Sequence, residues 1–115
     1  MTSIIIRKKD NSYSGFTCMG HAGYAKKNKF GEYEPDILCS AVSALTIATN
    51  NALEQLAGEK VNSVVNDEDG FLQCTFESVL VHEKSIILMD SLVLALEMLS
   101  KEYGKQYLQV KFEEV

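Results

Sequence analysis

The amino-acid sequence predicts an α/β (α+β) fold, a two-layer sandwich with two helices on one face of a mostly antiparallel sheet. Two apolar segments with a period near 3.6 residues indicate helices over 36–57 and 85–103. Five shorter segments rich in β-branched and aromatic residues indicate strands, which gives the order ββαββαβ. Hairpins alternating with helices favour a layer of helices on one side of a sheet. The 115 residues suit a single domain, 1–115.

The chain opens with a predicted hairpin. The β-branched segment "SIIIRK" at 3–8 predicts a strand, "DNSYSG" supplies turn residues, and "FTCMGH" at 16–21 predicts a second strand. Residues 22–35 are polar and contain two glycines and the chain's one proline, so they predict a loop. A loop this long in a compact domain is often functional.

The first predicted helix begins directly after Pro35. Proline disfavours a helical conformation for Glu34, so the chain should arrive extended. Asp36 then suits the N-cap, which places Cys39 at position N3 in the first turn. Gly58 predicts the end of this helix.

The second half of the chain predicts another hairpin, a second helix and a closing strand. "KVNSVVND" and "FLQCTFESVLV" (71–81) predict strands joined by "DG", a strong hairpin signal. Ser85 suits the N-cap of the second helix and Gly104 its stop. The wide apolar stripe of this helix indicates that it packs deeply or is shared with a partner subunit. "KQYLQVKFEEV" alternates apolar and polar residues, as in a strand.

Composition excludes several classes of function. The formal net charge of −5 argues against direct nucleic-acid binding, which needs a basic face. Three cysteines without CxxC spacing argue against a disulfide framework or a structural metal site, and nothing in the sequence calls for a cofactor. No apolar run suits a signal peptide or a membrane span. We therefore expect a cytoplasmic protein with reduced thiols and no membrane partner.

The chemistry that the sequence offers lies around Cys39. A cysteine at a helix N-terminus is stabilised as the nucleophilic thiolate by free N–H groups and the helix dipole, and the same N–H groups suit an oxyanion. His21, at the end of the preceding strand, is the candidate base for Cys39. Gly20 and Gly23 flank His21, which indicates close backbone approach by a substrate or unusual dihedral angles.

The sequence leaves open which residues support His21 and Cys39. Asp36 is the nearest acidic group that could orient His21, but its competing role as N-cap is favoured. Ser43 shares a helix face with Cys39, so it either bonds His21 or a substrate or back-bonds to its own helix. The alternative for Cys39 is a purely structural role as a buried core thiol beside Leu38. Cys18 and Cys74 lie inside predicted strands and are expected to be inert.

The segments "GHAGYA" and "DILCSAVSAL" together resemble the motif of the bacterial ribosomal-processing cysteine protease family (Prp, or YsxB-like). The resemblance extends to length and element order. It implies a cysteine endopeptidase that removes the N-terminal extension of large-subunit ribosomal protein number twenty-seven, with His21 as base and Cys39 as nucleophile. Asp36 and Ser43 match the motif's other polar positions. The resemblance also implies a homodimer.

One departure from the family pattern concerns the loop. The segment between His21 and Cys39 is longer here, with extra residues around "KKNKFGEYEP", and the glycine expected before the acidic pair is displaced to Gly31. In this family the loop is expected to order when a peptide binds. Tyr24, Phe30 and Tyr33 would then cover a hydrophobic substrate residue.

Two alternatives to the protease remain. A non-catalytic dimeric module for ribosome assembly or binding would also suit the size, the apolar second helix and the long loop. A thiol redox role for Cys39 is a third hypothesis, against which the sequence offers no nearby resolving cysteine.

Overall fold

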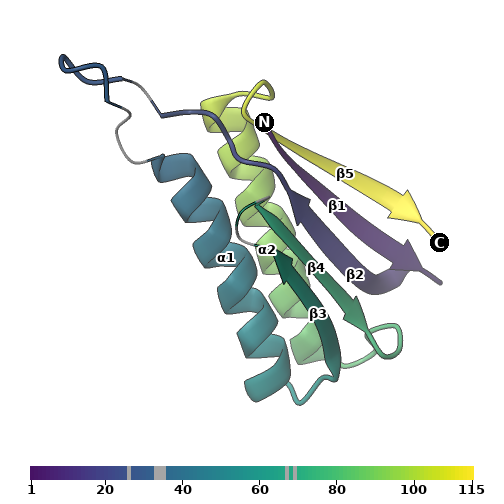
Figure 1. Ribbon diagram of the computed structural model, residues 1–115. Coiled ribbons are helices and arrows are strands. Elements are labelled where there is room, and N and C mark those ends of the chain that lie inside the picture. Colours follow the sequence, from purple (N-terminus) through teal and green to yellow (C-terminus); the bar gives the residue numbers. More distant parts are fainter. Residues whose placement is uncertain (26, 33–35, 67, 69) are drawn as a thin grey trace.

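The computed structural model describes residues 1–25, 27–32, 36–66, 68 and 70–115, and it confirms the order ββαββαβ. The strands are β1 Thr2–Lys9, β2 Ser12–Met19, β3 Val61–Asn66, β4 Phe71–Phe76 and β5 Leu108–Glu114, and the helices are α1 Ile37–Gln55 and α2 Glu83–Tyr103. Both helices lie side by side on one face of the sheet, as predicted (Figure 1). Residues 27–32, in the loop before α1, project from the end of the molecule where α1 begins.

The sheet has the strand order β3-β4-β2-β1-β5. Its first four strands pair antiparallel, and only the β1–β5 pair is parallel. This confirms a mostly antiparallel sheet. The last strand can pair parallel because α2 carries the chain back along the helical layer before β5 begins.

The core lies between the sheet and the two helices. Alternate residues of the strands point toward the helices, and the register Ile4↔Cys18, Ile6↔Phe16 and Phe16↔Cys74 aligns them across β1, β2 and β4. The helices complete the core with a set of fully or almost fully buried side chains, namely Leu38, Val42, Leu53, Met89, Leu92 and Leu96. Thus the apolar residues that alternate along the strands and those that recur every 3.6 residues along the helices pack together in one hydrophobic core.

Turns and helix ends follow the local chemistry. Asp10 and Asn11 both have positive φ angles, 53° and 64°, so they form the two-residue hairpin between β1 and β2. The predicted turn "DNSYSG" is therefore shorter than expected, and its last residues belong to β2. Gly58 (φ 71°) and Gly104 (φ 110°) follow the ends of α1 and α2, as predicted.

Several other predicted boundaries were also wrong. The chain leaves β4 at Phe76 rather than residue 81, because Leu80 is buried and its N–H donates to the Tyr13 carbonyl at 3.0 Å outside the sheet ladder. The N-cap of α2 is His82, and Ser85 lies inside the helix. There the fully buried Ser85 hydroxyl donates to Glu59 Oε1 at 2.8 Å, a tertiary contact that replaces the capping role. The closing strand starts at Leu108, after a turn, and not at residue 105.

Several expectations concern residues outside the described part of the chain. These are the extended Glu34 before Pro35, the covering role of Tyr33, and the aspartate of the "DG" turn. Among the described residues, no helix is both long enough and apolar enough to cross a membrane.

Candidate active site

Cys39 is presented by the first turn of α1. Asp36 has extended dihedral angles (φ −81°, ψ 97°), and its Oδ1 accepts the Cys39 backbone N–H at 2.9 Å. This is the N-cap geometry that the sequence predicts, and it puts Cys39 at N3. Because the Cys39 N–H already donates a hydrogen bond to Asp36, it is not available to stabilise an oxyanion.

Asp36 also closes the base of the projecting loop. Its second oxygen, Oδ2, accepts the backbone N–H of Tyr24 at 3.0 Å. The Tyr24 ring packs edge-on against Tyr103 and Tyr107, with centroids 5.0 and 5.2 Å away. In this structure, which holds no peptide, Tyr24 therefore anchors the loop to the end of α2, and its covering role in a peptide complex stays a prediction.

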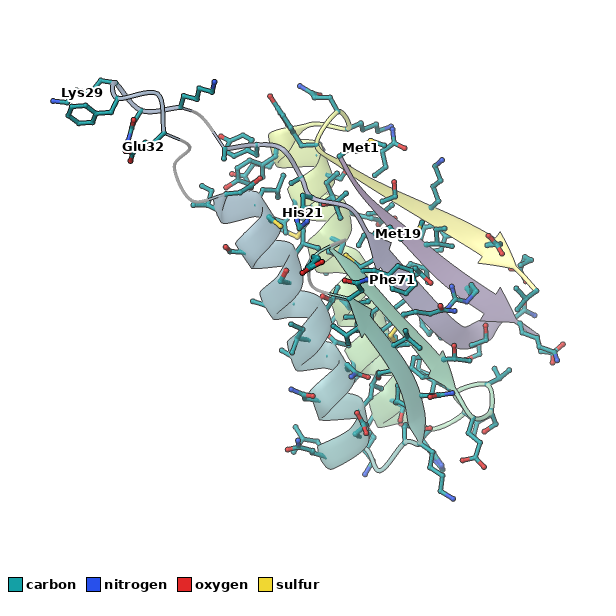
Figure 2. The ribbon with its side chains drawn as sticks, viewed as in Figure 1. Met1, Met19, His21, Lys29, Glu32 and Phe71 are labelled. Carbon is teal, nitrogen blue, oxygen red and sulfur yellow. The ribbon has the colours of Figure 1, made fainter. Side chains whose placement is uncertain are left out.

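The tip of this loop is a tight turn of its own. The Asn28 side-chain oxygen accepts the N–H groups of Phe30 and Glu32 at 2.9 and 3.0 Å. The Phe30 side chain is 75% exposed, so it does not contact the cleft. Lys29 and Glu32 lie at the far end of the loop in Figure 2.

His21 lies two residues beyond the end of β2, and not within the strand as predicted. Figure 2 shows it between the sheet and the beginning of α1. Its Nδ1 is 3.7 Å from the Cys39 Sγ, and its Nε2 is 3.3 Å from the backbone carbonyl oxygen of Glu68. The structure thus brings the two predicted residues into contact and adds a third group that the sequence did not indicate.

Gly20 and Gly23, on either side of His21, are glycines for different structural reasons. Gly20 has φ 85°, and a Cβ there would lie 2.5 Å from the Met1 carbonyl oxygen, so the N-terminal residue and not a substrate makes the close approach. Gly23 has φ 69° with open space around it, which supports the unusual-dihedral interpretation alone. Both positions set the path of the chain through His21.

A cleft of about 330 Å³ opens beside this pair. Cys39, His21 and Ser43 line it, and so do apolar side chains of α1, β3 and β4, namely Val42, Ile47, Val65, Phe71 and Leu72. Ser43 therefore shares the cleft face with Cys39, as its spacing predicts. The arrangement offers a nucleophilic sulfur at one end of a largely apolar groove.

The other two cysteines are buried thiols. Burial raises the pKa of Cys18 and of Cys74 to about 11, which keeps both neutral near pH 7 and agrees with their predicted inertness. Cys18 nevertheless borders the same cleft as Cys39, a proximity that the sequence did not reveal. The described residues hold no group of three His, Cys, Asp or Glu suited to a metal ion.

The comparison with protein families finds that the model for "Cysteine protease Prp" matches residues 1–108. A Bacillus subtilis (strain 168) protein named ribosomal processing cysteine protease Prp is 26% identical over 102 residues, covering 86% of each chain.

Two solved structures resemble the whole chain. One is an essential ribosomal processing protease Prp from S. aureus with a covalently linked product peptide, at TM-score 0.81 and 20% identity, covering 98% of this chain and 100% of that one. The other is SMU.848 from Streptococcus mutans, at TM-score 0.80 and 26% identity, covering 100% and 96%. Both share the fold described above.

Proposed function

This chain belongs to the cysteine protease Prp family, and we propose that it processes a large-subunit ribosomal protein, number twenty-seven, by removing its N-terminal extension. The protein is a cysteine protease. In the proposal Cys39 is the nucleophile and His21 the base, and the reaction takes place in the cytoplasm during ribosome maturation. The S. aureus relative, which holds a product peptide, supports a peptide as the substrate.

One observation carries the assignment of the dyad. The Cys39 Sγ and the His21 Nδ1 lie 3.7 Å apart at one end of the apolar cleft. Contacts of this kind are often longer in a free enzyme than in its substrate complex, so the distance suits a nucleophile and its base. Cys39 also lies at N3 of a 19-residue helix, the first-turn position that the sequence predicts for the nucleophile.

The proposed reaction follows from this geometry. The Cys39 thiolate attacks the carbonyl carbon of the scissile peptide bond, and His21 donates a proton to the departing amine nitrogen. A water molecule then attacks the thioester carbon while His21 takes its proton, which releases the carboxylate product and restores Cys39. Cys39's own N–H is bonded to Asp36, so other N–H groups would serve the oxyanion.

The walls of the cleft support a hydrophobic substrate residue beside the scissile bond. Val42, Ile47 and Phe71 line the same cleft as the Cys39 sulfur, and a side chain of phenylalanine type would bury apolar surface of the cleft together with its own. Ser43, an exposed polar side chain of the cleft, would contact the substrate backbone in this proposal. Asp36 acts in this proposal through the helix start and not on His21.

Cleavage of a synthetic peptide that carries the ribosomal protein's N-terminal extension tests the proposal. Cys39→Ala should abolish formation of the two products detected by mass spectrometry, and His21→Ala should reduce it by at least about 100-fold. Cys74→Ala, which removes a thiol outside the cleft, is the matched control and should retain cleavage. If Cys39→Ala cuts as fast as the parent protein, the assignment is wrong.

We also propose a homodimer formed through α2. Ile87, Leu94 and Met98 are each more than 60% exposed and lie on one stripe of that helix. Analytical ultracentrifugation should find a concentration-dependent dimer that Leu94→Asp disrupts. Leu56→Asp changes an even more exposed leucine, the C-cap residue of α1, and should leave association unchanged. Loss of the dimer in both variants, or in neither, would contradict this interface.

A further inference from the structure

The turn between β3 and β4 reaches the imidazole of His21. The Glu68 carbonyl oxygen lies 3.3 Å from the His21 Nε2, although the two residues are 47 positions apart. Gly70, in the same turn, lines the cleft with His21. Glu68 and Gly70 are therefore part of the wall around the imidazole.

This contact determines which ring nitrogen carries the proton. A carbonyl oxygen only accepts hydrogen bonds, so Nε2 must be the protonated nitrogen when it bonds Glu68. A neutral imidazole carries one N–H, which leaves Nδ1 bare. Nδ1 is the atom that faces the Cys39 sulfur at 3.7 Å, so the Glu68 contact selects the tautomer that can accept the thiol proton.

Gly70 allows the turn to come this close. Its φ is 61°, and a Cβ at this position would lie 2.7 Å from the Gly20 carbonyl oxygen and 3.0 Å from the His21 Cε1. Any side chain here would push the turn away from the ring. Gly20 is itself packed against Met1 on its other side, so the backbone before His21 is held between two neighbours.

We propose that Glu68, through its carbonyl, and Gly70 are positioning residues that fix the tautomer and orientation of His21. The inference rests on the proposed Cys39–His21 dyad. It extends that dyad to a third, backbone-borne group, which takes the part that an amide or carboxylate side chain plays in other nucleophile–base pairs. Neither residue touches the substrate's reacting atoms in this scheme.

The first test measures the tautomer directly. The spectra are recorded in a Cys39→Ala background, which removes any thiolate beside the ring, and at about pH 9, a pH that favours neutral imidazole groups in general. ¹⁵N–¹H correlation spectra of the two histidines, assigned with His82→Ala, should show His21 as the Nε2–H tautomer. A predominant Nδ1–H form would overturn the proposal, whether or not the protein cleaves the ribosomal peptide.

The second test compares two glycines of like conformation. Gly58 has φ 71° and open space around its Cα, so Gly58→Ala brings the same backbone strain without crowding His21. Gly70→Ala should lower kcat by about 10- to 100-fold, because displacement of the base by about 1 Å has that effect, and Gly58→Ala should stay within about twofold of the parent.

A readout without substrate separates positioning from binding. Alkylation of Cys39 by iodoacetamide at about pH 7 should be slower in Gly70→Ala than in Gly58→Ala, since only the former misplaces the base. Equal rates in the two variants, or a loss of cleavage confined to KM, would overturn the proposal. If Cys39→Ala still cleaves the peptide, Cys39 and His21 are not the catalytic dyad and the proposed function fails. The tautomer of His21 is measured independently of that outcome.

Discussion

Burial divides the three cysteines into two kinds. Cys18 and Cys74 have pKa values raised to about 11, so at pH 8 only about one molecule in a thousand carries a thiolate at either position. Cys39 is only partly buried, at the edge of the cleft. We expect iodoacetamide at pH 8 to modify Cys39 well before the other two, as read by peptide mass spectrometry. Equal labelling of all three in the folded protein would contradict the structure.

The same two thiols predict how stability depends on alkaline pH. Their pKa is raised from 9.0 to about 11 by folding, so the stability they contribute is complete below pH 9 and is lost as the pH rises toward 11. Burial and the hydrogen bond to Asp90 raise the pKa of Tyr13 as well, which acts in the same direction.

Urea unfolding between pH 7 and pH 10 measures this effect. Each buried thiol should account for a loss of roughly 1 kcal/mol in the free energy of unfolding. Cys74→Ala should remove its own share of the pH dependence, apart from a constant cost for the lost side chain. A stability that does not change over this interval would show that the thiols ionise as they do in the unfolded chain.

Residue chemistry could be predicted from the sequence where it is local. Pro35, Asp36 and Cys39 are adjacent in sequence, so the capped helix start with its cysteine followed from spacing alone. The Glu68 carbonyl that contacts His21 could not be predicted, because every residue carries a carbonyl and the contact depends on how a distant turn packs. Gly70 was visible only as a turn residue.

At the scale of elements, one carboxylate links the start of α1 to the projecting loop. Asp36→Ala removes both hydrogen bonds and should cost about 1 kcal/mol of stability in urea unfolding. Asp36→Asn keeps one oxygen for the helix cap but faces the Tyr24 N–H with an amide N–H₂. We expect it to retain most of the stability while hydrogen exchange at Tyr24 accelerates.

The comparison of the two variants decides what Asp36 does. Equal exchange at Tyr24 in Asp36→Asn and in the parent would show that the loop is held by the ring contacts with Tyr103 and Tyr107 instead. A loss of stability as large in Asp36→Asn as in Asp36→Ala would show that the cap does not depend on the remaining oxygen.

Helices and strands were predictable as elements but not always at their ends. Periodicity identified α1 and α2 because each buries one face along its whole length. Ser85 misled the prediction of the α2 start, since a buried serine bonded to Glu59 has the same letter as a capping serine. The apolar residues after Phe76 likewise resemble a strand, although Leu80 fills the core from outside the sheet.

At the scale of the whole molecule, the two helices and the sheet share one core, so we expect them to unfold together. Leu96 is completely buried between α2 and the sheet, whereas Leu94 on the same helix is 61% exposed. Leu96→Ala should destabilise the fold by about 2–5 kcal/mol, and Leu94→Ala by less than about 0.5 kcal/mol at protein concentrations where the chain is monomeric. Thermal and urea unfolding of both variants measure the difference.

The sequence predicted the layers and the mostly antiparallel sheet, but not the strand order. The parallel pairing of β1 with β5 joins the two ends of the chain, and no local pattern encodes which sheet edge the last strand takes. The family resemblance supplied the protease class. The geometry that relates His21 to its neighbours came only with the folded chain.

The packing of Tyr24 on Tyr103 and Tyr107 has a consequence for how this enzyme folds during its synthesis. During synthesis the segment that bears His21 and Cys39 leaves the ribosome before Tyr103 and Tyr107, which hold its loop, and before β5, the parallel partner of β1. We therefore expect a nascent chain to stay proteolytically silent until α2 and β5 have emerged. The site would thus be assembled only after the helix and strand that follow it in the sequence have left the ribosome.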